Sequence, residues 1–113
     1  MDEPLQEITV ATKTKPAEKT KPKRQPQYNV LLWDDDQHSY EYVIEMMQKV
    51  FGHSAGRSLR IAFEVDNHGV AICLTTNLEH AELKCQQITS FGRDQLIATS
   101  VGSMKSTIER VEC

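Results

Sequence analysis

The chain has 113 residues, of which 39% are hydrophobic and 6% aromatic, and its formal net charge is −3. This length supports one small folded domain. The sequence has no apolar run long enough to cross a bilayer, and its N-terminus lacks the basic-then-apolar order of a signal peptide, so we expect a cytoplasmic protein with no membrane partner. Its three cysteines fit reduced thiols better than a disulfide framework.

Charge and proline content divide the chain near residue 27. Residues 1–27 contain all four prolines and six basic against four acidic side chains, whereas residues 28–113 contain all five glycines and seven basic against twelve acidic ones. Because residues 1–27 have no aromatic and few large aliphatic side chains, they cannot bury enough apolar surface to offset their ordering entropy. We therefore predict a disordered N-terminal extension over residues 1–27 and a folded domain over residues 28–113.

A strand and a helix are predicted at the start of the folded region. Tyr28–Trp33 is a short run of apolar and aromatic residues that stops at three aspartates, which is typical of a strand that ends in a polar turn. Ser39 is a candidate N-cap for a helix that continues to about Phe51, because apolar residues recur there at three- and four-residue steps. Gly52 is a suitable residue to end this helix.

A second helix and a second strand follow. Ser54 is a candidate N-cap for a helix over Ala55–Val65. The apolar positions expected to face the core are Leu59, Ala62, Phe63 and Val65. Asp66–Gly69 is predicted to be a turn. Val70–Thr76 is the clearest strand of the chain, since it is a continuous apolar run of strand length.

The last predicted elements are a helix over Leu78–Phe91, capped by Asn77 and ended by Gly92, a loop over Arg93–Ser103 and a strand over Met104–Val111. The resulting order is strand, helix, helix, strand, helix, strand. This order predicts an α+β fold, a two-layer sandwich in which a small three-stranded antiparallel sheet packs against three helices.

The acidic turn Asp34–Asp36 and the neighbouring His38 are the first candidates for chemistry. They could ligate a divalent cation, since Mg²⁺ takes few carboxylates and keeps its waters, but no second ligand cluster follows in the sequence. A solvated turn that caps the next helix is the simpler interpretation, and binding of an organic cation such as an amine is a third.

Catalytic and nucleic-acid-binding signatures are missing from the sequence. It has no zinc-ligand spacing, no Gly-rich phosphate loop and no Ser/His/Asp or Cys/His arrangement, so we expect neither enzymatic activity nor a bound metal or cofactor. The basic residues of the N-terminal extension are interleaved with Thr, Pro and Glu rather than with aromatic residues, and the folded region is acidic. Both features argue against a nucleic-acid partner.

Five blocks of residues occur in a characteristic order between Tyr28 and Glu109. They are V-L-x-x-D-D at Val30–Asp35, E-Y-V-I-x-x-M-Q-K-x-F at Glu41–Phe51, G-x-A-I-C at Gly69–Cys73, E-x-A-E-x-K at Glu79–Lys84 and G-S-M-x-x-x-I-E at Gly102–Glu109. Together they resemble the ClpS family, the adaptors of the AAA+ Clp protease. The resemblance implies the same α+β element order and a disordered N-terminal extension.

The resemblance implies a binding function without catalysis. ClpS-like domains bind proteins whose first residue is bulky and hydrophobic, the bacterial N-degron, and deliver them to the Clp unfoldase. The residues that would hold the α-amino group of such a protein are Asp34, Asp35 and Asp66, where Asp34 replaces the usual Asn and Asp66 the usual His. An α-amino group, with a reference pKa of about 7.7–8.0, is mostly cationic at pH 7 and has three N–H donors.

The resemblance also assigns an apolar pocket for the side chain of the bound N-terminal residue. Its lining would be Tyr40, Val43, Ala62, Val65 and Met104. Tyr40 and Ala62 stand where the family usually has Met. Because Ala62 is the smaller residue, we expect a deeper pocket unless Tyr40 folds over it. The alternative is the same fold and unfoldase docking with a shifted ligand specificity, for example toward larger aromatic residues. A cation-dependent enzyme that uses the acidic turn is the less favoured alternative.

A docking surface is implied on the third predicted helix. Glu79 and Lys84 would contact the N-terminal domain of the Clp unfoldase there, and residues 1–27 become a candidate element for substrate delivery. We expect a cytoplasmic monomer whose partners are this unfoldase and N-degron proteins or peptides.

Overall fold

The computed structural model describes residues 25–112, so all but the last three residues of the predicted extension, and Cys113, lie outside the described part. The described elements are β2 (Tyr28–Trp33), α2 (Tyr40–Phe51), α3 (Ala55–His68), β3 (Val70–Thr76), α4 (Leu78–Thr89) and β4 (Ser106–Arg110). Their order is the predicted one. None of the helices in residues 25–112 is long and apolar enough to span a membrane.

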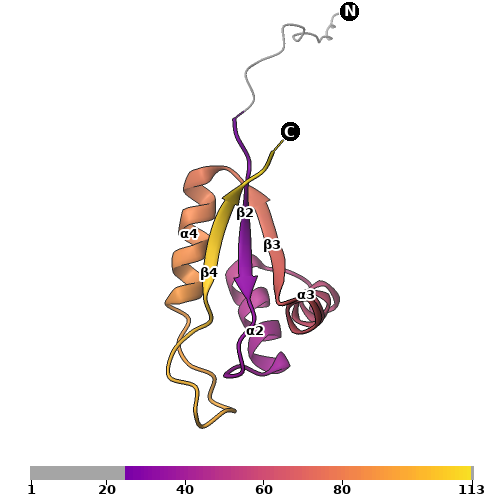
Figure 1. Cartoon of the computed structure of the whole chain (residues 1–113), viewed down its shortest axis with the longest axis vertical. Coiled ribbons are helices and arrows are strands. Elements are labelled where there is room, and N and C mark those ends of the chain that lie inside the picture. Colours follow the sequence, from indigo (N-terminus) through magenta and orange to yellow (C-terminus); the bar gives the residue numbers. More distant parts are fainter. Residues whose placement is uncertain (1–24, 113) are drawn as a thin grey trace, which may run out of the picture.

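The three strands form an antiparallel sheet in the order β3-β2-β4, with β2 in the centre. Figure 1 shows α2 behind the middle of the sheet, α4 beside β4 and α3 beside β3. The predicted α+β fold is therefore confirmed. Within the described chain, no helix covers the face of the sheet that is turned to the viewer in Figure 1.

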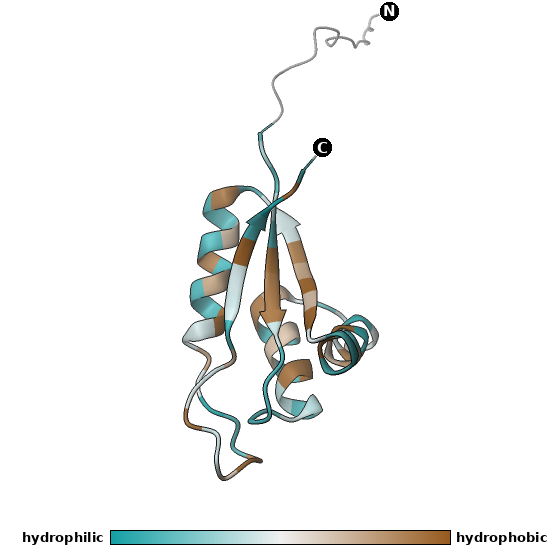
Figure 2. Cartoon of the chain, viewed as in Figure 1, coloured by the Kyte–Doolittle hydropathy of each residue, from teal (hydrophilic) through white to brown (hydrophobic). Residues whose placement is uncertain are grey.

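Alternation along β2 separates the two faces of the sheet. Val30 and Leu32 are fully buried against the helices, whereas Leu31 and Trp33 lie on the opposite face, because successive side chains of a strand alternate. Figure 2 shows β2 as hydrophobic over most of its length. Burial of each large aliphatic side chain contributes about 1.5–3 kcal/mol, so Val30 and Leu32 are substantial contributors to the stability of the core.

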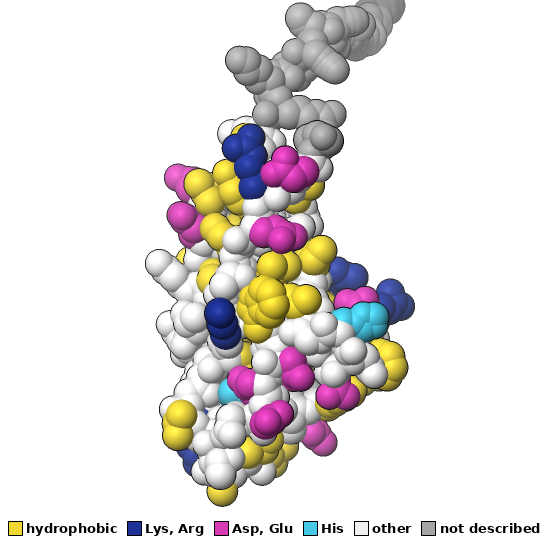
Figure 3. All heavy atoms as spheres, viewed as in Figure 1, with side chains coloured by type: hydrophobic (Ala, Val, Ile, Leu, Met, Phe, Trp, Pro, Cys, Tyr) yellow, Lys and Arg dark blue, Asp and Glu magenta, His cyan; other side chains and the backbone are white. Residues whose placement is uncertain are grey.

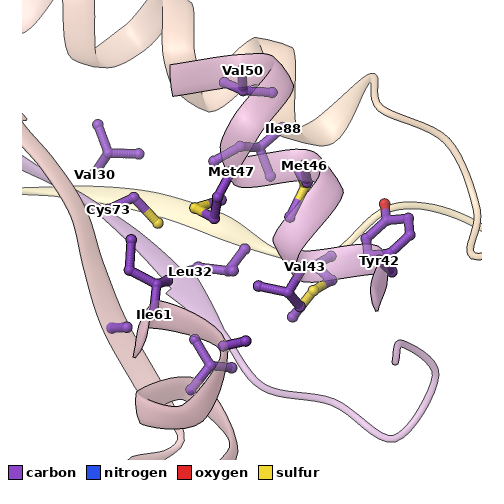
Figure 4. Packing of buried hydrophobic residues seen from close by; sticks show 14 of the residues in the cluster. Val30, Leu32, Tyr42, Val43, Met46, Met47, Val50, Ile61, Cys73 and Ile88 are labelled. Atoms are coloured by element: carbon purple, nitrogen blue, oxygen red, sulfur yellow. The ribbon is translucent and has the colours of Figure 1, made fainter. Parts of the chain in front are cut away.

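Helix α2 covers the inner face of the sheet with residues at three- and four-residue spacing. Its buried residues are Tyr42, Val43, Met46, Met47 and Val50. Figure 4 shows them in one cluster with the inner residues of β2 and β3. Both ends are capped as predicted, since Ser39 Oγ accepts from Tyr42 N and Gly52 adopts a left-handed φ of 72°.

A β-bulge changes which residues of β3 face outward. Val30 lies opposite Leu74 but Leu31 lies opposite Ile72, so Cys73 is an extra residue on β3. Its side chain is fully buried in the core, and burial raises the pKa of its thiol to about 12.

Helix α3 is longer than predicted. The predicted turn at Asp66–Gly69 is wrong for its first three residues, which form the last turn of α3, and only Gly69 leaves the helix, with a φ of 83°. Asp, Asn and His favour turns by propensity, but Gly69 supplies the left-handed cap and donates its N–H to Val65 O, which satisfies the helix end. Asn67 Nδ2 also donates to Phe63 O within this last turn.

The buried face of α3 also differs from the prediction. Leu59 and Phe63 were expected in the core, but their side chains are 50% and 56% exposed. Ala62 and Val65 are buried as predicted, together with Ser58 and Ile61. Ser58 tolerates burial because its hydroxyl donates to Ser54 O, so a polar residue at this position did not signal the inner face.

The last two elements are shorter than predicted. Helix α4 ends at Thr89 with Ser90 as its cap, rather than at Phe91, although Phe91 still packs against the core. Strand β4 covers Ser106–Arg110 rather than Met104–Val111. Residues 90–105 form an irregular segment between them.

Candidate functional site

One cavity of about 270 Å³ brings together all eight residues predicted to bind a substrate. It lies beyond the end of β2, between the first turn of α2 and the last turn of α3. Its lining includes Asp34, Asp35, Tyr40, Val43, Ala62, Val65, Asp66 and Met104. Figure 3 shows acidic side chains gathered near this end of β2. We call it the carboxylate cavity.

Asp34 contributes a carboxylate whose charged form is destabilised by its surroundings. Its N–H donates to Gly69 O at 2.9 Å, which ties the end of β2 to the end of α3. The pKa of its carboxyl group is raised above the ordinary value, first because partial burial disfavours the charged form and then because Asp66, Asp35 and Asp36 are negatively charged. A cation in the cavity would relieve this repulsion.

Asp35 is oriented by two hydrogen bonds to the same oxygen. Its Oδ1 lies 2.8 Å from Gln37 N and 2.7 Å from His38 Nδ1, and its Oδ2 has no hydrogen-bond partner within residues 25–112. The other ring nitrogen of His38 lies 2.7 Å from Gly102 O. His38 therefore links the carboxylate of Asp35 to the backbone at Gly102 through its two ring nitrogens.

Tyr40 and Asp66 bridge the mouth of the cavity. Tyr40 Oη donates to Asp66 Oδ2 at 2.9 Å, which joins the first turn of α2 to the last turn of α3. The hydrogen bond to Asp66 is the main reason that the pKa of Tyr40 is raised, followed by loss of solvent and by the charges of Asp66 and Asp34. A helix C-terminus carries partial negative charge, so the Asp66 carboxylate is placed where a cation or a donor stabilises it.

Apolar side chains form the inner walls. Val43 comes from α2, Ala62 and Val65 from α3, and Met104 from the segment before β4; all four are buried. Met104 was expected at the start of the last strand but lies just before β4. The cavity combines carboxylates at one end with a small apolar chamber.

A buried aspartate holds the segment 90–105 against this site. Asp94 Oδ2 accepts from Ser39 N at 2.6 Å and Asp94 Oδ1 from Leu96 N at 2.8 Å. Burial acts to raise the pKa of Asp94, but these hydrogen bonds and the nearby His38 outweigh it, so the pKa lies below its ordinary value. The start of α2, which carries Tyr40 and Val43, is fixed in this way.

Sequence reasoning missed two of these residues. Asp94 lies in a predicted loop, where the sequence suggests only its local hydrogen bond to the N–H two residues further along. Its second hydrogen bond joins it to Ser39, which is 55 residues away in the sequence. His38 was considered only as a cation ligand, and nothing local indicates its bond to Gly102.

The carboxylates share the cavity without forming a metal centre. Among residues 25–112, no group of three or more His, Cys, Asp or Glu side chains is arranged to hold a metal ion. The carboxylates of Asp34, Asp35 and Asp66 line the cavity and can accept hydrogen bonds from N–H donors.

Glu79 and Lys84 lie apart from this cavity, on α4. Glu79 is exposed in the first turn and lines a separate hollow that also includes Gln25 and Pro26, where the described chain begins. Lys84 Nζ donates to Val50 O at 2.7 Å and lies 5.9 Å from the centre of the Phe51 ring, so part of its role is to hold the end of α2.

Comparison with known proteins gives consistent matches. A family model described as ATP-dependent Clp protease adaptor protein ClpS matches residues 23–97. An ATP-dependent Clp protease adapter protein ClpS from a Synechococcus species is 36% identical over 89 residues, which cover 78% of this chain and 98% of that protein. The ClpS of Pectobacterium carotovorum is 38% identical over 80 residues, 69% of this chain and 76% of that one.

A solved structure is also similar. It is that of Agrobacterium tumefaciens ClpS2 bound to L-phenylalaninamide, with a TM-score of 0.67 and 25% sequence identity. The match covers 78% of this chain and 100% of the other.

Proposed function

The chain belongs to the ClpS family of adaptors of the ATP-dependent Clp protease, and we propose that it binds proteins with a bulky hydrophobic N-terminal residue and delivers them to the Clp unfoldase. The observation that carries this proposal is the carboxylate cavity, which joins acceptors for an ammonium group to a chamber for one apolar side chain. The ligand of the similar Agrobacterium protein, L-phenylalaninamide, has these two parts on one carbon atom.

Recognition of the ammonium group follows from the geometry of the carboxylates. Asp35 Oδ2 has no partner in the described part of the chain, while Asp35 Oδ1 is fixed by two donors, so the free oxygen is oriented without using the ligand. Asp34 and Asp66 provide further acceptors around the same cavity. An ammonium group with three donors satisfies them and lowers the repulsion that, after loss of solvent, contributes to the raised pKa of Asp34.

Selectivity for the N-terminal residue follows from the size of the cavity. Its volume of about 270 Å³ is near the lower end of the range of about 300–1,000 Å³ that is usual for small-molecule sites. It therefore accepts one side chain rather than a longer segment. Burial of that side chain against Val43, Val65 and Met104 contributes the apolar part of the affinity.

A shifted preference among N-terminal residues is the second candidate, favoured by the Tyr40–Asp66 hydrogen bond. This bond uses one carboxylate oxygen and places an aromatic ring at the mouth of the cavity, while Ala62 leaves room inside. A flat aromatic side chain can stack against such a ring, so we expect Phe, Tyr or Trp to bind better than Leu.

The test is a peptide series that differs only in the first residue. Peptides with N-terminal Phe, Tyr, Trp, Leu or Ala are titrated against the full chain by fluorescence anisotropy, each with and without N-acetylation. We expect binding for the bulky residues, weaker binding for Ala and none after acetylation, which removes the charge and two donors. Binding should be unchanged by a chelator, and equal or absent binding across the series contradicts the proposal.

Two variants show where the peptide binds. Asp35→Asn removes the charge of the oriented carboxylate and should weaken binding of the Phe peptide. Glu45→Gln removes one negative charge from the exposed side of α2, where Glu45 only pairs with Lys49, and should not change binding.

A further inference from the structure

A second hollow lies on the face of the sheet that no described helix covers. It has a volume of about 670 Å³, and its floor includes Leu31, Trp33 and Ile72, with Arg57 and Arg60 of α3 along one side. We call it the sheet groove. It shares no residue with the carboxylate cavity. Figure 3 shows an apolar patch in the middle of this face with charged side chains around it.

The apolar surface of the groove is held in place by contacts of the Trp33 side chain. Trp33 Nε1 donates to Thr107 Oγ1 at 2.8 Å, and Lys105 Nζ lies 5.8 Å from the centre of its ring. The side chains of Trp33 and Ile72 are nevertheless 36% and 44% exposed. Adjacent large apolar side chains held in place and open to solvent are typical of a surface that binds another segment.

The charged lining of the groove has a positive part at Arg57 and Arg60, whereas its acidic residues are Glu64 and Glu109. Arg57 and Arg60 are both exposed, and neither forms an ion pair with another residue of the described chain. A partner with apolar side chains and carboxylates in one short segment would complement both the floor and the side of the groove.

Such a segment exists in this chain, outside the described residues. Within residues 1–24 every large apolar residue lies among the first ten, namely Met1, Leu5, Ile8 and Val10. Asp2, Glu3 and Glu7 accompany them, and the first basic side chain is Lys13. The extension thus has an acidic and apolar part, residues 2–10, followed by a basic part.

We propose that residues 2–10 of the same chain dock in the sheet groove, with their apolar side chains on Trp33 and Ile72 and their carboxylates toward Arg57 and Arg60. The intervening residues 11–24 can span up to about 50 Å when extended. Strand β2, which begins near the described start of the chain and ends at Trp33, is only about 20 Å long. The connection is therefore long enough for the segment to return to the groove.

Tethering makes even a weak contact effective. A segment joined by a short linker has an effective concentration in the millimolar range, so an intrinsic Kd of about the same size leaves the groove occupied for half of the time. Docking would keep residues 2–10 on the domain, and a partner that uses the extension would have to displace them first.

The single tryptophan of the chain gives a direct measurement, because it lies in the groove. Acrylamide quenching of Trp33 fluorescence is compared between the full chain and a variant without residues 2–10. Half occupancy should make the quenching constant about twofold lower in the full chain. Replacement of Leu5, Ile8 and Val10 by Ser should have the same effect as the deletion, whereas Ser at Thr12, Thr14 and Thr20 should have none.

A charge exchange tests the contact with α3. Arg57→Glu with Arg60→Glu should remove the protection of Trp33, and Glu3→Arg with Glu7→Arg in the same chain should restore it. Equal quenching of the full chain and the deletion variant overturns the proposal. Protection that increases with protein concentration also overturns it, because the occupant is then a second copy. Neither result depends on peptide binding in the carboxylate cavity.

Discussion

The carboxylate of Asp35 acquires its orientation from a neighbour that does not have to touch the ligand. His38 is buried beside the ring of Tyr42 and reaches both Asp35 and Gly102, so it connects the acidic turn to the segment before β4. Hydrogen bonds to charged groups contribute about 1.5–3 kcal/mol each. His38 is therefore a positioning residue for the proposed ammonium site.

His38→Phe tests this role. The substitution keeps an aromatic ring beside Tyr42 but removes both hydrogen bonds of the imidazole, so Asp35 Oδ1 retains only the bond from Gln37 N. We expect the Kd for a peptide with N-terminal Phe to increase about tenfold, measured by fluorescence anisotropy.

Gln37→Ala is the matched control for His38→Phe. Gln37 also contacts Asp35, but only through its backbone N–H, which alanine retains. Its affinity should match that of the unchanged chain. An equal loss of affinity in both variants would mean that the whole turn, and not the imidazole, orients Asp35.

At the scale of the elements, features set by neighbouring residues can be predicted from the sequence, whereas features set by contacts between distant residues cannot. Ser39, Ser54 and Asn77 cap the three described helices as predicted, because each accepts a hydrogen bond from an N–H only three residues further along the chain. Two positions of α3 were wrongly expected in the core because Leu59 and Phe63 form an apolar stripe that no other part of residues 25–112 buries. Which stripe meets the sheet depends on partners distant in sequence.

The candidate site also combines features that the sequence indicates with contacts that only the fold creates. Its eight proposed binding residues came from the resemblance to the family, whereas the contacts that orient them, from Asp94 to Ser39 and from His38 to Gly102, span more than fifty residues. No local pattern encodes such a contact, because hydrogen-bond partners brought together by the fold have no fixed spacing.

Asp94→Asn measures how strongly the segment 90–105 fixes the start of α2. The change removes the charge that accepts from Ser39 and Leu96, and leaving buried groups poorly paired costs about 1–3 kcal/mol at pH 7. Urea unfolding followed by circular dichroism gives this difference. Asp36→Asn, at an exposed position in the acidic turn, is the control and should have little effect.

The effect of Asp94→Asn on the free energy of unfolding should depend on pH in a defined direction. The pKa of Asp94 is lower in the folded chain than its ordinary value of about 3.9. Its stabilising contribution is therefore complete above that value and is lost as the pH falls through the lowered pKa. The free energies of unfolding of the unchanged chain and of Asp94→Asn should therefore become equal in acid. A difference between them that is independent of pH would show that packing rather than charge is responsible.

At the scale of the whole molecule, the proposed surfaces lie apart. The carboxylate cavity is at the end of β2 beyond Trp33, whereas Glu79 lies at the other end of the sheet, near Gln25. If both proposed surfaces are used, this separation would let one chain contact a substrate and an unfoldase at the same time.

Reversal of Glu79 and Lys84 tests the proposed unfoldase contact. Glu79→Lys with Lys84→Glu should abolish co-purification with the Clp unfoldase while peptide binding is retained. Lys84 also supports the end of α2, so Glu79→Lys alone, which breaks no hydrogen bond or ion pair within residues 25–112, separates docking from stability. Glu45→Lys is the control with the same change of charge, and undiminished co-purification of Glu79→Lys would place the docking surface elsewhere.

Helix α3 forms a common partition between the two hollows. Ala62, Val65 and Asp66 line the carboxylate cavity, whereas Arg57, Arg60 and Ile61 line the sheet groove. A tilt of this one helix would alter both volumes together. If such a tilt made occupancy of one hollow change the affinity of the other, thermodynamic linkage would require the reverse effect to be of the same factor. The strength of that coupling is limited by how firmly Ile61 and Val65 anchor the helix to the core.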